Sequence, residues 1–383
     1  MSAPAPVQAA PAAASGQDER FMRLALALGD RHLGLTWPNP SVGAVVVDGR
    51  GEPRILGQGI TQAGGRPHAE RLALAEAGAA ARGATLYVTL EPCSARSRGD
   101  DGPSCTDLIV AAGIRRLVVG APDPSPFAHG DGYPRLAAAG IEVVPHVLAT
   151  EACRAHRGHV LRVTEGRPQV TLKFARTADG FAARRQGPRL LISGEASNAR
   201  THLMRAHHDV IMVGVGTVLG DDPRLTVRLP GLEHRSPVRV VLDSGLRTPP
   251  GARLIATARE VPTWIVAGED APVEPERRLA AAGVEVMRVG TRDGRIDLGE
   301  ALRLLGTRGV TRVFSEGGPA IGEALVEADL VDACALATSA TPLGEEGIPA
   351  LGLHLSRALV ETFHLVSSED LGADRLDIFE RTR

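Results

Sequence analysis

Residues 68–93 read HAERLALAEAGAAARGATLYVTLEPC, and this stretch decides the fold of the first half of the chain. The spacing of its apolar residues predicts a helix that begins at His68 and ends at Gly78, followed by a strand over 84–90. The alternation continues in both directions. Strands are also predicted at 44–49, 115–120 and 141–145, and helices from Phe21, at 106–113 and at 151–162. Helices that alternate with short β-rich runs predict an α/β sandwich with a largely covered sheet.

The second half of the chain predicts another α/β domain of different sequence. Its strands are predicted at 169–175, 209–215, 238–243, 263–267, 284–289 and 311–317, with two more within 361–383. The helix at 151–162 runs into Glu165-Gly166-Arg167-Pro168, which indicates a boundary. We therefore predict one domain at 17–155 and a second at 168–383. Residues 1–16 are rich in alanine and proline, a composition typical of a disordered tail and unlike that of a signal peptide.

Composition narrows the classes of function. The chain has 383 residues, with 43 basic and 45 acidic side chains, so no broad attraction to nucleic acid or to an anionic membrane is expected. Aromatic residues make up only 3%, which disfavours a stacking surface for a polynucleotide. No apolar run approaches the ~20 residues of a membrane span. The four scattered cysteines are too few for a disulfide scaffold, which indicates a reducing compartment and hence the cytoplasm.

A metal site is predicted at the helix and strand ends of the first half. His68 opens a helix, Cys93 follows the strand at 84–90, and Cys105 begins another helix. One imidazole and two thiolates leave a fourth tetrahedral position for water, as a catalytic zinc requires. Zinc lowers the pKa of such a water to about 7. Glu70 is the predicted carrier of protons between this water and a leaving amine, in the order of residues found in zinc nucleobase deaminases.

The alternative is that two structural cysteines lie near an ordinary helix start. Eleven residues separate Cys93 from Cys105, which is wider than the usual Cys-x-x-Cys spacing. An interval of this length allows both cysteines to bind the same metal ion, but it does not fix the geometry of the metal site.

The first half resembles the deaminase part of the bifunctional riboflavin-biosynthesis deaminase–reductase family. The resemblance lies in WPNPSVGAVV (37–46), HAE (68–70), TLEPCS (89–94), PSCTDLIVAAGI (103–114) and DPSP (123–126). It implies a cytidine-deaminase-like three-layer α/β sandwich that hydrolyses the 2-amino group of a diaminopyrimidinone ribosylamino phosphate. It assigns Zn²⁺ to His68, Cys93 and Cys105, proton transfer to Glu70, and a place in the pyrimidine pocket to Asn39. The family usually has a shorter interval between the cysteines, with a histidine that this chain lacks.

Three stretches of the second half indicate a nucleotide-binding site. Within 209–228, a strand runs through Gly214-x-Gly216 into a loop with acidic and basic residues. After Glu316, a Gly317–Gly318 pair precedes a helix, and the free N–H groups at a helix N-terminus suit a diphosphate. A structural turn explains each loop equally well. Lys173 is the single lysine among 43 basic residues, which indicates a place for a compact ammonium, although chance retention at a surface is the alternative.

The second half is similar to the reductase domain of the same family, which has a dihydrofolate-reductase-like α/β fold and uses NADPH. That domain reduces a ribosylamino group to a ribitylamino chain. The resemblance assigns the cofactor to Ala175, Leu191, Thr217, Asp221, Ser244, Gly317, Gly318, Pro319 and Ala320. The residues assigned to the substrate are Lys173, Arg189, Arg205, Leu225, Arg228 and Glu316. Asp221 is also the implied proton-handling group, and the arginines suit a phosphate dianion.

Two residues depart from the family pattern. Where the family usually has Ser-x-Trp, this chain has Arg189-Leu190-Leu191. Leu191 lacks a ring to contact the cofactor. Arg189 replaces a small polar residue, and it either grips the substrate phosphate or obstructs the pocket.

The leading interpretation is a cytoplasmic enzyme with a zinc deaminase followed by an NADPH reductase. It acts on a small phosphorylated pyrimidine, without nucleic acid or membrane, as a homo-oligomer formed through the reductase domain. Two alternatives remain. The first is an active deaminase with an impaired reductase, and the second is a C-terminal nucleotide-binding regulatory module without chemistry.

Overall fold

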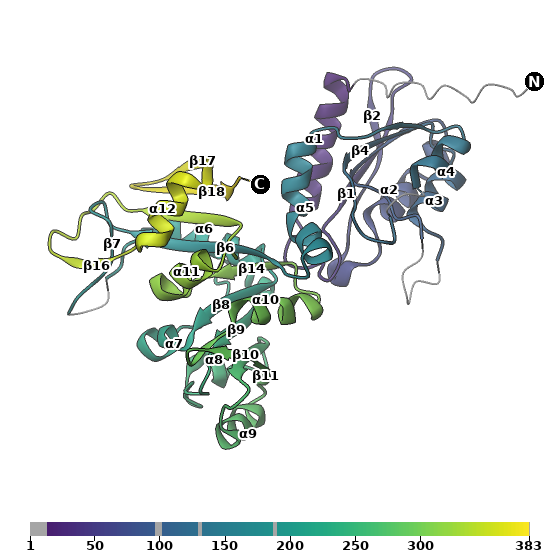
Figure 1. The fold of residues 1–383 in the computed structure, drawn as a ribbon. Helices are drawn as coiled ribbons and strands as arrows, with labels where there is room; N and C mark the ends of the chain where they lie inside the picture. Colours follow the sequence, from purple (N-terminus) through teal and green to yellow (C-terminus); the bar gives the residue numbers. More distant parts are fainter. Residues whose placement is uncertain (1–13, 96–101, 129–131, 187–189, 383) are drawn as a thin grey trace, which may run out of the picture. The chain divides into compact units, whose positions relative to one another are not determined.

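The chain folds into two compact units that meet in sequence after Thr164. The computed structural model describes residues 14–95, 102–128, 132–186 and 190–382, and the two units are Met1–Thr164 and Glu165–Arg383 (Figure 1). Residues 1–13 of the predicted tail lie outside the described residues. Its last two residues belong to the first helix, since Ser15 is the N-cap, where its side chain accepts a hydrogen bond from the backbone N–H of Asp18, and Gly16 is the first helical residue. No helix in the described ranges is long and apolar enough to cross a membrane.

The first unit is built on a five-stranded sheet with the order β2-β1-β3-β4-β5. Its strands are β1 (Gly43–Asp48), β2 (Arg54–Ile60), β3 (Thr85–Leu90), β4 (Arg116–Ala121) and β5 (Glu142–Val144). Its helices are α1 (Gly16–Asp30), α2 (Ala69–Ala77), α3 (Cys105–Ala112), α4 (Gly132–Ala138) and α5 (Ala149–Thr164), with 3-10 turns at Ala63–Gly65 and Gly78–Ala81. β1 runs antiparallel to both neighbours, whereas β3, β4 and β5 are parallel.

Helices cover both faces of this sheet, which gives three layers (Figure 1). Alternate residues of β1 point to opposite faces: Val45 packs in the cluster of α1, and Ala44 packs in the cluster of α2 and α3. α5 lies beside α1, and α4 lies with α2 and α3. The carboxyl ends of β3 and β4 therefore share one edge with the start of α2 and the end of α5, and this edge holds the first candidate site.

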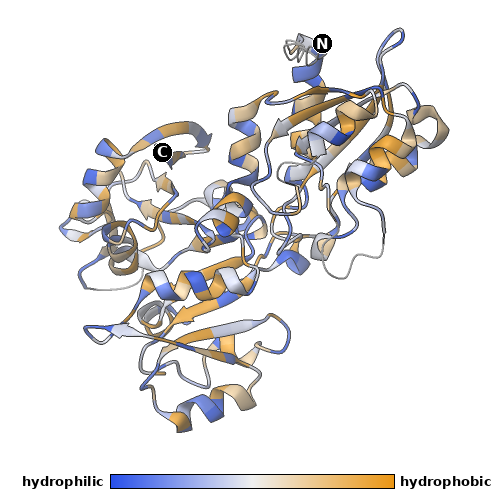
Figure 2. Cartoon of the chain, turned by 45° about the vertical axis from the view of Figure 1, so that its right-hand side comes forward, coloured by the Kyte–Doolittle hydropathy of each residue, from blue (hydrophilic) through white to orange (hydrophobic). Residues whose placement is uncertain are grey.

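The second unit is built on a nine-stranded sheet with the order β11-β10-β9-β8-β14-β6-β15-β18-β17. Its strands are β6 (Gln169–Arg176), β8 (Val210–Gly214), β9 (Val238–Leu242), β10 (Thr263–Gly268), β11 (Glu285–Val289), β14 (Arg312–Ser315), β15 (Ala333–Thr338), β17 (Phe363–Leu371) and β18 (Asp374–Arg381). The strands from β11 to β15 are parallel, and the β17–β18 hairpin adds antiparallel strands at one edge. Strands in the middle of both large sheets are mostly apolar, while the helices alternate apolar and polar residues (Figure 2).

Seven helices accompany this sheet in the described ranges. They are α6 (Glu195–Ala206), α7 (Val215–Asp221), α8 (Arg253–Ala256), α9 (Val273–Ala281), α10 (Leu298–Thr307), α11 (Gly318–Glu327) and α12 (Leu353–Glu361), with a 3-10 turn at Glu233–Arg235. Two short strand pairs complete the unit. They are β7 (Phe181–Arg184) with β16 (Gly347–Pro349), and β12 (Thr291–Arg292) with β13 (Arg295–Ile296).

The predicted strands of the second half are all present, but four elements differ from expectation, namely α7, β15, β7 and β16. Residues after Gly214 were expected to form a loop, and they form α7 instead. The sequence did not predict β15 or the β7–β16 pair. β15 reads ACALAT, without β-branched residues before its last position, so its pairing with β6 and β18 rather than its own propensity makes it a strand.

Candidate active sites

The first unit brings the three predicted metal ligands together. His68 precedes α2, Cys93 lies in the loop after β3, and Cys105 is the first residue of α3. Their ligand atoms all lie within 4.8 Å of one another, with Nδ1 of His68 at 3.4 Å from the sulfur of Cys105 and 3.8 Å from that of Cys93. One imidazole and two sulfurs this close fit a tetrahedral Zn²⁺ with a fourth position for water.

The environment of Cys93 favours the thiolate that a metal binds. Its sulfur accepts the backbone N–H of Cys105 at 3.3 Å, at the first residue of α3. The hydrogen bond from the Cys105 thiol, followed by that from His68, lowers the pKa of Cys93 to about 4 although burial opposes this shift. Cys93 itself lies in a loop, and this hydrogen bond places its sulfur at the start of α3.

Glu70 lies in the first turn of α2 and faces the same cavity as His68. Its side chain is buried, with 3% of the residue exposed. Burial raises the pKa of this carboxyl above its usual value, against the opposing effect of His68. A buried carboxyl that retains its proton more readily is suited to moving protons between a water and an amine.

The cavity beside the metal ligands has a volume of about 310 Å³, a size suited to a small ligand. Asn39 lines it and donates a hydrogen bond from Nδ2 to the carbonyl of Gly65 at 3.0 Å. A side chain at Gly65 would collide with Asn39, since a Cβ there would lie 2.4 Å from Nδ2. The two loops are therefore packed together, and Asn39 is fixed in the wall. Sequence interpretation missed several polar residues of this wall, among them Arg66, Asp123, His159 and Arg162.

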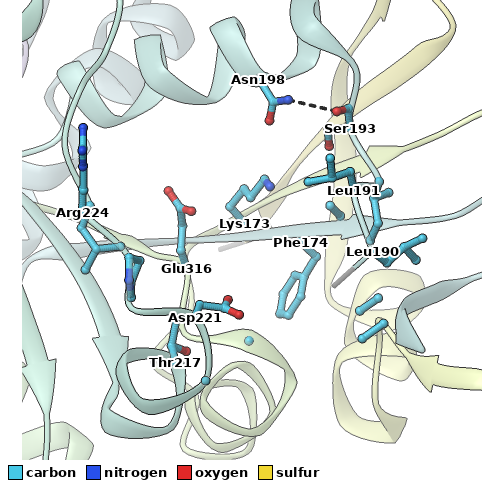
Figure 3. Close-up of a pocket in the computed structure, with 18 of the residues that line it drawn as sticks. Lys173, Phe174, Leu190, Leu191, Ser193, Asn198, Thr217, Asp221, Arg224 and Glu316 are labelled. Carbon is cyan, nitrogen blue, oxygen red and sulfur yellow. Dashed lines mark hydrogen bonds between the residues drawn. The ribbon is translucent and has the colours of Figure 1, made fainter. Parts of the chain in front are cut away.

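The second unit contains a larger cavity of about 860 Å³ at the carboxyl ends of neighbouring parallel strands (Figure 3). β8, β14 and β6 are adjacent in the sheet, so α7 after β8, Glu316 after β14 and Lys173 on β6 face a common space. Ligands of parallel α/β sheets bind at this end of the strands. The predicted residues that line this cavity are Lys173, Ala175, Leu191, Arg205, Thr217, Asp221, Leu225, Arg228, Glu316, Gly318 and Pro319.

Four predicted residues are not among those lining this cavity. Ser244 follows β9 and donates a hydrogen bond to the carbonyl of Gly294. Gly317 is the N-cap of α11, and Ala320 lies in the first turn of that helix. Arg189 lies outside the described residues. Sequence interpretation also missed lining residues, among them Ser193, Asn198, Arg224 and Arg253.

A buried charge network crosses the floor of the cavity. Arg205 holds Glu316 with two hydrogen bonds, Nε to Oε1 at 2.6 Å and Nη2 to Oε2 at 2.9 Å. Burial lowers the pKa of Lys173, and Glu316 opposes that shift. Although burial acts against it, Arg205 and Lys173 lower the pKa of Glu316. The carboxylate thus lies between two cations, and the guanidinium fork of Arg205 faces Glu316 in this structure.

Close packing explains two glycines of the predicted nucleotide-binding loops, Gly214 and Gly317. A Cβ at Gly214 would lie 2.6 Å from the Cδ1 of Ile321, and one at Gly317 would lie 2.9 Å from the Cβ of Ile321. Gly318 has a φ of 72°, in the left-handed region that favours glycine. The starts of α7 and α11 therefore approach each other closely. α7 places Thr217 and Asp221 one turn apart, and both line the cavity.

Two family models match the chain, one in each half. A model of the RibD C-terminal domain matches residues 168–376, and a model of the cytidine and deoxycytidylate deaminase zinc-binding region matches residues 15–121. The riboflavin biosynthesis protein RibD of Aquifex aeolicus is 36% identical, over 95% of this chain and 98% of its own length. RibD of Escherichia coli is 37% identical, over 82% of this chain and 86% of its own length.

Solved structures are similar over nearly the whole length of the chain. RibD of Acinetobacter baumannii superposes with a TM-score of 0.82 at 30% identity, covering 96% of this chain and 99% of that one. A diaminohydroxyphosphoribosylaminopyrimidine deaminase/5-amino-6-(5-phosphoribosylamino)uracil reductase from Thermotoga maritima gives a TM-score of 0.80 at 32% identity, covering 95% and 99%. Since one domain model covers more than half of the chain and the relatives match it nearly from end to end, the chain belongs to the RibD family of bifunctional riboflavin-biosynthesis enzymes, with a zinc-binding deaminase domain and an NADPH-dependent reductase domain.

Proposed function

We propose that this chain catalyses two consecutive steps of riboflavin biosynthesis on one phosphorylated pyrimidine. The first step replaces the 2-amino group of the diaminopyrimidinone by oxygen and releases ammonia. The second transfers hydride from NADPH and reduces the ribosylamino group to a ribitylamino chain. The observation that carries the proposal is the assembly of His68, Cys93, Cys105 and Glu70 at one cavity, in the same chain as the reductase cavity.

In the deaminase step, Glu70 moves the protons. His68, Cys93 and Cys105 would hold Zn²⁺, which when bound would supply hydroxide at neutral pH by lowering the pKa of a water. Glu70 would accept a proton from the attacking water and pass it to the amino nitrogen, which leaves as ammonia. The buried position of Glu70 keeps bulk water from competing for this proton. Asn39, fixed by Gly65, orients the pyrimidine from the opposite loop.

In the reductase step, α7 and α11 would hold NADPH, and the charged side chains of the cavity would hold the substrate. Thr217 and the backbone of Gly318 are the groups that would bind the cofactor, since free N–H groups at the start of α11 suit its phosphates. Lys173 and Glu316 would orient the opened ribosyl chain, and Arg228 would bind its phosphate. Asp221 would transfer the proton to the nitrogen of the ribosylamino group, while the hydride of NADPH goes to the carbon bonded to that nitrogen.

Two measurements on the same protein test this function. The chain is incubated with the diaminopyrimidinone phosphate, with and without NADPH, and ammonia and NADPH absorbance are followed separately. We expect ammonia in both reactions, and NADPH oxidation only as the deaminated product forms. Ammonia release without NADPH oxidation would leave an active deaminase with an impaired reductase, an alternative that nothing in the cavity or in the relatives favours.

We also propose that the enzyme is a cytoplasmic homo-oligomer that associates through the reductase unit. Large apolar side chains are exposed near one edge of its sheet, at Leu353 and Val360 of α12 (80% and 84% exposed) and at Leu365 of β17. Exposed apolar residues beside an edge strand support association with another chain. Sedimentation equilibrium tests the oligomer, and Leu353→Glu with Val360→Glu is expected to shift it toward the monomer.

A further inference from the structure

The deaminase cavity has a wall that is made by α5. His159, Arg162 and Val163, in the last turns of this helix, line the cavity together with His68 and Glu70. α5 lies beside α1 on one face of the sheet, whereas His68 and Cys105 belong to the layer of α2 and α3 on the other face (Figure 1). The cavity is thus bounded by metal ligands from one layer and by basic side chains from the opposite layer.

His159 fixes α5 to the loop after β4. Its Nε2 lies 2.9 Å from Oδ1 of Asp123, and both residues are buried, at 7% and 8% exposed. The same oxygen of Asp123 accepts the backbone N–H of Ser125 at 2.9 Å. His159 and Arg162 are three residues apart in the helix, so they project from the same side of α5. The position of Arg162 relative to the cavity is therefore set by a buried contact one turn away.

Arg162 is linked to the pyrimidine side of the cavity as well. Its Nη2 donates a hydrogen bond to the carbonyl of Pro38 at 3.0 Å, and Pro38 directly precedes Asn39. A guanidinium has five N–H donors in a planar fork, so it can hold a backbone carbonyl and an anionic oxygen together. Arg66, the other arginine among the described lining residues, is only two residues from His68 and belongs to the metal side of the cavity.

We propose that Arg162 binds the phosphate group of the deaminase substrate. The inference rests on the proposed function, which places the reacting amino group at the metal. The phosphate is at the other end of that molecule, beyond the ribosyl group, and it therefore extends toward a different wall of the cavity. Arg162 supplies a cation from the opposite layer, and arginine binds phosphate oxygens through charge-assisted, bidentate hydrogen bonds. Arg162 thus selects the phosphorylated pyrimidine over the dephosphorylated one.

The test compares two substrates and three variants in the full chain. Ammonia release is measured with the diaminopyrimidinone phosphate and with the same compound lacking its phosphate, for Arg162→Met, Arg162→Lys and the control Arg157→Met. Arg157 is on the same helix and is not among the described lining residues. For Arg162→Met we expect kcat/KM to fall on the order of 10- to 100-fold for the phosphorylated substrate, mainly through KM, as a lost hydrogen bond to a charged group predicts.

The dephosphorylated substrate should be converted equally by Arg162→Met and the parent, and Arg162→Lys should recover part of the loss. Equal losses on both substrates with full zinc content would overturn the proposal, because Arg162 would then only support Pro38 and Asn39. No loss on either substrate would overturn it too. If the Arg162→Met protein loses its zinc, the two substrates are compared with Arg162→Lys instead, and the same outcomes support or overturn the proposal. A parent chain that releases no ammonia from either substrate would instead refute the proposed function.

Discussion

At the scale of single residues, Cys105 and Glu70 provide a test that separates metal binding from proton transfer. Cys105→Ser removes a soft ligand from a trio within 4.8 Å, so we expect zinc content to fall from about one atom per chain and ammonia release to fall with it. Glu70→Gln keeps all three ligands but cannot carry a proton, so zinc should stay while deamination drops ~10²–10⁴-fold. Metal analysis and ammonia release are measured on both variants. Full zinc in Cys105→Ser would refute its role as a ligand.

Leu191 provides a test of the reductase cavity. It lines the cavity and is 86% exposed, so no other described side chain covers most of its surface. A ring at this position should stack on the cofactor and add ~0.5–1.5 kcal/mol beyond area burial, or up to about tenfold in affinity. We therefore expect Leu191→Trp to tighten NADPH binding modestly, as measured by fluorescence titration, with Leu191→Ile as the aliphatic control. Weaker NADPH binding by Leu191→Trp would show that the indole obstructs the cavity.

The structure places close together the residues of the first site that carry their own chemical signal in the sequence. His68, Glu70, Cys93 and Cys105 combine residue types and an order that few structural motifs share. Arg162 has no such signal, since the carbonyl that it binds belongs to Pro38, 124 residues away in sequence. The contact depends on packing two layers of the sandwich, which spacing along the chain does not specify.

At the scale of elements, the sheet order explains what local patterns missed. β15 has weak strand propensity, yet buried Asp332 just before it binds the guanidinium of Arg167 and the backbone N–H of Val170, at the start of β6. These contacts hold β15 beside β6. α7 was expected to be a loop because two glycines open it. Gly214 is its N-cap, outside the helix proper, and Gly216 lies in its first turn, so neither interrupts its interior.

A glycine of β2 provides a test of how α2 is positioned. A Cβ at Gly59 would lie 2.0 Å from the carbonyl oxygen of Ala69, at the start of the helix that carries Glu70 and follows His68. Gly59→Ala should therefore push α2 away, lowering the free energy of unfolding by ~1–3 kcal/mol and weakening zinc retention against a chelator. Denaturant unfolding and zinc release are measured, with Gly51→Ala as control because no atom lies within 4 Å of a Cβ there. Unchanged zinc retention would mean that the metal site does not depend on this contact.

At the scale of the whole molecule, the two cavities lie in separate units, because all lining residues of the deaminase cavity precede Thr164 and all those of the reductase cavity follow Glu165. The activities should therefore be separable. Glu70→Gln should oxidise NADPH at the parental rate when it is supplied with deaminated substrate. A well-folded Glu70→Gln protein that has lost both activities would contradict independent sites.

The single lysine allows the reverse separation by chemical modification. Lys173 faces the reductase cavity, and burial lowers its pKa, so more of its amine is unprotonated near neutral pH than in an exposed lysine. Acetylation removes its charge beside Glu316, which should abolish NADPH oxidation while ammonia release continues. Mass spectrometry distinguishes acetylation of Lys173 from that of the α-amino group, and Lys173→Met shows the effect on ammonia release of modifying the α-amino group alone. Bound NADPH and substrate should protect Lys173. If Lys173 is completely acetylated and NADPH oxidation is unchanged, the ammonium of Lys173 is not needed in the reductase step. Arg205, which donates hydrogen bonds to Glu316, would then be the cation that matters there.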